Sequence, residues 1–152
     1  MKLAKLIIGL TLVFILLGIS SGSSYATNNS CVAKKEYTGD NENKLVLIWS
    51  SDDPMVAKRV ALMYPHAAQR NKWFDEVTLV IWGPSTKLIS EDTELQNKLD
   101  QMIKDGVIIK ACVACANEYG VADKLKELGY EVIPMGLPLT DYLKNGYNVL
   151  SF

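Results

Sequence analysis

Two of the chain's three cysteines, Cys112 and Cys115, lie directly after a short apolar run. That run, Val107–Ile109, has the composition of a buried β-strand, and we expect a helix to begin just after Cys112. Open α/β sheets bind their ligands beyond the carboxyl ends of their strands. A helix N-terminus lowers the pKa of a thiol, and the thiolate is its reactive form. The position therefore suits a nucleophilic or sulfur-carrying cysteine. The side chain of Lys110 is expected on another face.

The Cys-x-x-Cys spacing has other meanings, and the surrounding sequence argues against most of them. A zinc site needs four ligands, but the chain has no second cysteine pair and its one histidine, His66, is distant. Ala116 stands where the c-type haem motif has histidine. A thioredoxin-type pair typically opens a long helix after a first strand, whereas this pair enters a segment interrupted by Gly120. Two interpretations stay open, a reactive Cys112 or a buried pair that forms a structural disulfide.

The N-terminus has the pattern of a secretory signal peptide over residues 1–26. Lys2 and Lys5 supply positive charge, an apolar segment follows, and Ser24–Ala26 is a small-x-small cleavage site. The apolar segment is shorter than the roughly 20 residues that span a membrane, so we expect cleavage rather than retention as an anchor, an exported protein, and no stable membrane insertion afterwards. Residues 27–43 are polar and aperiodic, and we interpret them as a flexible leader.

The composition of the chain limits the classes of molecule that it could bind. Without Lys2 and Lys5 the 16 basic residues become 14 against 17 acidic ones, a formal charge of −3. The chain has no basic block, so we expect no nucleic-acid partner. Three cysteines is an odd number, so one, such as Cys31 of the leader, stays free, pairs between chains or reacts. An oxidising compartment permits a Cys112–Cys115 disulfide.

From residue 44 onward, apolar runs alternate with segments of helical periodicity. We predict strands at 44–49, 77–82, 107–111, 131–134 and 147–152. We predict three helices and one helical turn. The first helix runs from Asp53-Pro54 to about 68 with a bend at Pro65, the second from about 91 to Gly106, and the third over about 121–128. The helical turn lies at 139–143. Strands that are apolar throughout indicate a parallel sheet covered on both faces. The sequence thus predicts one three-layer α/β/α domain over residues 44–152.

Other candidate residues have structural explanations. His66 is interpreted as a surface or half-buried helix residue, and the Ser50–Asp53 segment as a helix cap rather than an anion site. Trp49 and Trp82 fit core packing, with a rim pocket as the alternative. Neither a phosphate-binding glycine loop nor a serine nucleophile elbow occurs.

Three segments carry a family resemblance: the run from Ile109 through Cys112 and Cys115 to Gly120-Val121, the strand 44–48, and the strand ending in Trp82-Gly83. In these segments the chain resembles the DsrE/DsrF-like sulfur-relay family of DsrE/TusD type. The resemblance covers residues 44–152. In TusD-like members the acceptor cysteine opens a Cys-Val-Ala-Ala-Ala-type run after the apolar strand, which is the position of Cys112. Cys115 replaces a small residue of that run.

The resemblance implies a five-stranded parallel sheet and a trimeric or hexameric homo-oligomer. It also implies a sulfurtransferase-like carrier that passes sulfur as a persulfide on Cys112 between donor and acceptor proteins or inorganic sulfur compounds. Cys115 would then be a resolving thiol or a guard against over-oxidation. No cofactor or metal is expected. The best-understood relays of this family are cytoplasmic, so the export signal favours periplasmic handling of inorganic sulfur.

Three hypotheses follow from these observations. A carrier requires a reactive Cys112 that solvent can reach. A non-catalytic oligomeric binding module would hold Cys112 and Cys115 in a structural disulfide. A soft-metal protein would ligate an ion with both thiolates, completed by symmetry-related chains.

Overall fold

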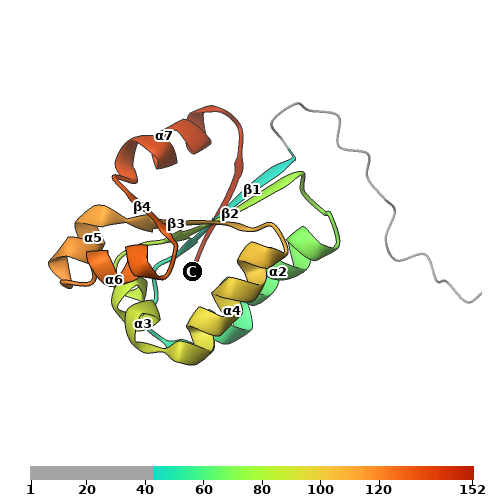
Figure 1. Cartoon of the computed structure of the whole chain (residues 1–152). Helices are drawn as coiled ribbons and strands as arrows, with labels where there is room; N and C mark the ends of the chain where they lie inside the picture. The colour runs from blue at the N-terminus through green and yellow to red at the C-terminus, as the bar shows by residue number, and fades with distance from the viewer. Residues whose placement is uncertain (1–42) are drawn as a thin grey trace, which may run out of the picture. The chain divides into compact units, whose positions relative to one another are not determined.

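The computed structural model describes residues 43–152. The predicted signal peptide and all but the last residue of the predicted leader lie outside the described residues. The described chain forms a five-stranded sheet of order β4-β3-β2-β1-β5 in which every pair of neighbours is parallel (Figure 1). Its strands are β1 Lys44–Trp49, β2 Glu76–Ile81, β3 Ile108–Cys112, β4 Glu131–Ile133 and β5 Asn148–Ser151. All five predicted strands are present, with ends shifted by at most one residue.

Helices fill the connections between the strands. They are α1 Pro54–Val56, the π-helix η1 Ala57–Ala61, α2 Met63–Arg70, α3 Ser85–Glu91, α4 Thr93–Lys104, α5 Val113–Glu118, α6 Ala122–Glu127 and α7 Gly136–Lys144. Among the described residues no helix is both long and apolar enough to cross a membrane.

Helices cover both faces of the sheet, and the two layers differ in size. The larger core lies on the face of Leu45, Leu47 and Trp49, where residues of η1, α2, α3, α4 and α6 pack. The smaller core lies on the face of Val46 and Val80. Figure 1 shows α7 on the opposite side of the sheet from α2, α3 and α4. The predicted three-layer α/β/α architecture is confirmed, with α7 as the helix of the thin layer.

The first helix begins as predicted. Asp53 is its N-cap, and its Oδ1 accepts hydrogen bonds from the backbone N–H groups of Met55 (2.7 Å) and Val56 (3.3 Å). Pro54 occupies the first helical position, where its missing N–H costs nothing because that donor has no intrahelical partner. The acidic cluster after β1 is therefore explained by capping.

Pro65 produces the predicted irregularity, in the form of a wider helical turn. Proline cannot donate to the carbonyl four residues earlier, and its ring crowds that carbonyl. The preceding turn, η1, is π-helical, and the N–H of Leu62 bonds to the carbonyl of Ala57 at 2.9 Å, five residues back. Regular α-helix resumes at Met63.

Two helices were underestimated from the sequence. The helix α3 is absent from the predicted helices, and Pro84, directly after the predicted strand that ends in Trp82-Gly83, is its N-cap residue. Asp92 then adopts an extended conformation and caps α4 by accepting from the N–H of Leu95 at 3.0 Å. The predicted helical turn at 139–143 is instead the nine-residue helix α7. Its greater length matters for the site below.

Candidate functional site

Cys112 occupies the junction of a central strand and a helix. It is the last residue of β3, which lies between β2 and β4, and it is the N-cap residue of α5. Its backbone is extended (φ −72°, ψ 113°), so the helix begins only at Val113. Its side chain belongs to the small core and is 4% exposed. The sequence placed this thiol at the correct edge of the sheet, but not its burial.

Cys115 lies three residues into α5 and is half-buried against the small core. Residues three apart on a helix share a side of it, and both cysteines pack in the small core. Cys115 interacts there with Cys112 and with the backbone of Gly83. Both cysteines are free thiols. The two sulfur atoms that the sequence singled out thus form one site.

The Gly83 turn is fixed by a buried serine that links two strand ends. The Ser85 hydroxyl donates to the carbonyl of Trp49 at 2.5 Å, and its oxygen accepts from the N–H of Trp82 at 3.1 Å. Gly83 itself has φ +63°, a left-handed conformation in which a side chain would be strained. Cross-linking the ends of β1 and β2 holds the turn against Cys115.

The two tryptophans have different environments. Trp49 is completely buried in the large core, as core packing predicted. Trp82 is half-buried and packs against the small core that contains both thiols. Only Trp82 therefore belongs to the surroundings of the candidate site.

The environment of Cys115 disfavours its thiolate. Burial, followed by the hydrogen bond with Cys112, raises the pKa of the Cys115 thiol, and the hydrogen bond from Gly83 opposes this only partly. A raised pKa means that less thiolate is present at any given pH. At neutral pH a smaller fraction of Cys115 than of an ordinary cysteine is therefore ionised, which slows its attack without preventing it.

This pKa shift predicts the pH dependence of Cys115 alkylation. An ordinary cysteine is half ionised at about pH 8.5, so Cys115 in the folded protein should reach half of its maximal alkylation rate at a higher pH. The rate would be followed by peptide mass spectrometry after iodoacetamide pulses, with an unfolded peptide spanning residues 110–120 as the control. A midpoint below that of the peptide would contradict the expected shift.

Lys110 corrects one expectation from the sequence. Its side chain lies on the same face as Cys112, because alternate residues of a strand share a face, and its register partner Val80 belongs to the same small core. Its Nζ is 3.4 Å from Glu131 Oε2. Burial lowers the pKa of Lys110 most, but the combined attractions of Tyr142 and Glu131 outweigh it and raise that pKa. Lys110 is thus a cation on the thiol face.

The region of α7 covers Cys112. Met135 precedes α7, is 1% exposed and belongs to the same buried cluster as Cys112. Tyr142 and Tyr147 pack against that cluster, with their ring centroids 4.9 Å apart. Cys112 was expected to be reachable by solvent, and this is wrong for the structure described. The cover was missed because α7 was expected as a single turn.

The remaining candidates do not join this site. His66 is buried rather than on the surface or half-buried as expected, and it packs with the helices of the large core. Cys31 lies outside the described residues. Within residues 43–152, no group of three or more histidine, cysteine or acidic side chains could hold a metal ion.

Comparisons with known proteins agree with this fold. The model of the DsrE/DsrF-like family matches residues 43–152. The chain belongs to the DsrE/DsrF-like family. Family membership supports a general role in sulfur relay.

Two solved structures are similar. One is BT1422 from Bacteroides thetaiotaomicron, a conserved protein of unknown function, with 35% identity and a TM-score of 0.70 over 72% of this chain and 95% of that one. The other is the ychN protein from E. coli, with 14% identity and a TM-score of 0.57 over 73% of this chain and 99% of that one, a likeness of fold. No curated protein matches the chain.

Proposed function

We propose that this DsrE/DsrF-like protein carries sulfur as a persulfide on Cys112, with Cys115 as its resolving thiol. The observation that carries the proposal is the pair of free thiols that lie in one small cluster at the end of β3. A lone structural cysteine would need no such partner. The free state of both thiols supports a carrier over a module locked by a disulfide.

Cys112 is the better acceptor of the two. Cys112 is the N-cap residue of α5 and holds the position of the acceptor cysteine in the sequence run that resembles TusD-like members. Cys115 has a raised pKa and its thiolate is correspondingly scarce. Cys112 is 4% exposed in the structure described, so loading requires the α7 region that covers it to move aside. The Cys112 thiolate then attacks the outer sulfur of a persulfide or polysulfide donor. A bond forms between Sγ and that sulfur, and the donor's sulfur–sulfur bond breaks. The rest of the donor leaves with the electron pair, as a thiolate from an organic persulfide or as a shorter polysulfide anion from a polysulfide.

Two routes release the sulfur. An acceptor thiolate can attack the outer sulfur, and Cys112 then leaves as a thiolate, so that no net oxidation occurs. Alternatively, the Cys115 thiolate attacks the inner sulfur and expels hydrosulfide. The sulfur is then reduced to sulfide while the two thiols are oxidised to a disulfide, which a dithiol reductant must reopen.

Cys115→Ser should lengthen the lifetime of the persulfide. The variant keeps the Cys112 nucleophile but cannot form the intramolecular disulfide, so sulfide release without an added acceptor should fall to the level of spontaneous decay. After polysulfide loading and desalting, released sulfide and remaining persulfide would be measured over time. Ser90→Ala is the control, because it removes a half-buried hydroxyl of α3 that bonds only to the Lys87 carbonyl of the same helix. Equal sulfide release from wild type and Cys115→Ser would exclude Cys115 as the resolving thiol.

We further propose that the carrier works outside the cytosol on inorganic sulfur compounds, as the N-terminal pattern over residues 1–26 predicts. We also propose assembly into a trimer or hexamer. Leu137 and Leu143 on α7 are 78% and 62% exposed, and burial of such side chains between subunits would be favourable. Mass determination of the mature protein in solution tests both points, since it gives the N-terminus and the subunit count.

A further inference from the structure

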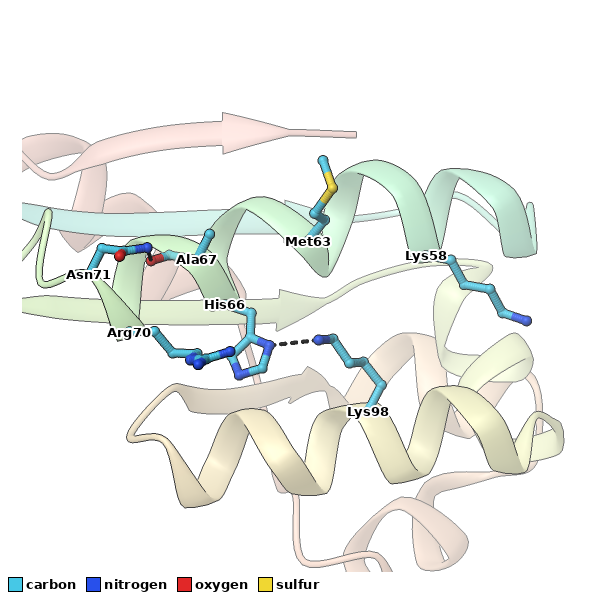
Figure 2. A pocket seen from close by; sticks show the side chains of 7 residues that line it. All are labelled: Lys58, Met63, His66, Ala67, Arg70, Asn71 and Lys98. Carbon is cyan, nitrogen blue, oxygen red and sulfur yellow. Dashed lines mark hydrogen bonds between the residues drawn. The ribbon is translucent and has the colours of Figure 1, made fainter. Parts of the chain in front are cut away.

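A cleft lies on the face of the sheet opposite the cysteines, between η1–α2 and α4. Its volume is about 400 Å³, and its lining includes Lys58, His66, Arg70 and Lys98. Figure 2 shows Lys98 extending from α4 toward the ring of His66 on α2. Beyond Lys58 and Lys98 a second hollow of about 590 Å³ follows, to which Arg59 contributes. The cleft is large enough for a small molecule.

The contacts of His66 fix its orientation. The Asp105 carboxylate can only accept, so the His66 Nε2, 2.6 Å from Oδ2, carries the proton and donates. The His66 Nδ1 lies 2.6 Å from Nζ of Lys98. His66 is 6% exposed, so the ring is held in place from both sides. This contact positions the side-chain nitrogen of Lys98 at the cleft.

The positive charge of the cleft is only partly balanced. One carboxylate that touches its lining, that of Asp105, contacts His66 and attracts Arg70. The two hollows are lined by four cationic side chains and one carboxylate, that of Glu94, which pairs with Lys58 at 2.6 Å. Within the described chain, neither Arg70 nor Lys98 has a carboxylate oxygen within ion-pair distance. The protein as a whole carries a formal charge of −1. A local excess of cations on an acidic protein, around a cavity, indicates an anionic ligand.

We propose that this cleft binds a small tetrahedral oxyanion, either free or as the terminal group of a small molecule. The guanidinium of Arg70 offers planar paired donors and the Lys98 ammonium a point charge, a combination that suits phosphate and sulfate groups. The site is separate from the thiols and does not depend on persulfide chemistry. Phosphate, sulfate and thiosulfate share the recognised chemistry, and their relative affinities identify the source.

The single histidine of the chain makes a direct test possible. The ring signals of His66 would be followed by NMR in protein without a histidine tag, during titration with sodium phosphate, sulfate or thiosulfate. Sodium chloride at matched ionic strength is the control. We expect a saturable shift with at least one oxyanion and none with chloride. Lys98→Gln and Arg70→Gln should each weaken binding about tenfold or more, because each removes a charged hydrogen bond.

Lys104→Gln is the matched control variant, because Lys104 is an exposed lysine on the same helix that lines neither hollow. It should bind as wild type does, and so should Cys112→Ser, whatever becomes of its sulfur chemistry. Thermal unfolding of each variant verifies its fold. The proposal is overturned if no oxyanion gives a saturable shift, if chloride reproduces the shift, or if Lys104→Gln weakens binding as much as Lys98→Gln.

Discussion

Cys112→Ser should reduce the rate of sulfur uptake roughly 10³-fold or more, the order of loss seen when a covalent nucleophile is removed. A serine hydroxyl is close to a thiol in size but is not ionised near neutral pH and forms no persulfide. Uptake of labelled outer sulfur from a polysulfide would be measured on desalted protein. Cys112 is buried at the end of β3, so unfolding curves must accompany the rates.

Cys115→Ser is the matched comparison for this experiment. It changes the same chemical group one helical turn away, and in our account it keeps the acceptor and loses only the resolving step. Uptake should therefore stay within a few-fold of wild type. Uptake that persists in Cys112→Ser and disappears in Cys115→Ser would reverse the two roles.

Met135→Ala should expose Cys112 and destabilise the domain. Met135 is buried in the small core beside Cys112, and removing a buried methionine side chain costs about 2–5 kcal/mol of unfolding free energy. The vacated volume lies between the thiol and the α7 region that covers it. Alkylation of Cys112 under native conditions should therefore become faster than in wild type, as measured by timed iodoacetamide labelling and peptide mass spectrometry.

The control must separate local access from general instability. Leu125 is a fully buried residue of α6 on the opposite face of the sheet, and Leu125→Ala should cost a similar free energy. It should not accelerate labelling of Cys112 to the same extent, because it leaves the α7 region intact. If both variants accelerated the labelling of Cys112 equally, iodoacetamide would be reaching Cys112 through global unfolding rather than through local opening of the α7 region.

Local sequence signals were sufficient for most of the fold. Continuous apolar runs predicted the five strands, and Asp53 with Pro54 predicted the first helix start, because capping and proline geometry act within a few residues. Helix α3 was missed because the local sequence at its start is ambiguous. Gly83-Pro84 fits a turn as well as a helix start, and only packing of Ile89 in the large core decides between them.

The site was predictable in its thiols but not in its surroundings. Cys112 and Cys115 lie close in sequence, and the strand-to-helix junction follows from the apolar run before them. The cover over Cys112 comes from Met135 and Tyr142, distant in sequence. The same is true of the contacts that bury His66 between Lys98 and Asp105. No local pattern encodes such long-range pairs. The face of the sheet on which the Lys110 side chain lies could have been predicted, because alternate residues of a strand share a face and Lys110 is two residues before Cys112.

The most direct test of the sulfur-carrier account is the intact mass of the reduced, polysulfide-treated wild-type protein, followed by location of the added mass. We expect the mass of one added sulfur atom on the peptide that contains Cys112, decaying to a protein two hydrogen atoms lighter as the Cys112–Cys115 disulfide forms. A mass that shows only the disulfide at the earliest times, or an added sulfur confined to Cys31, would contradict the account.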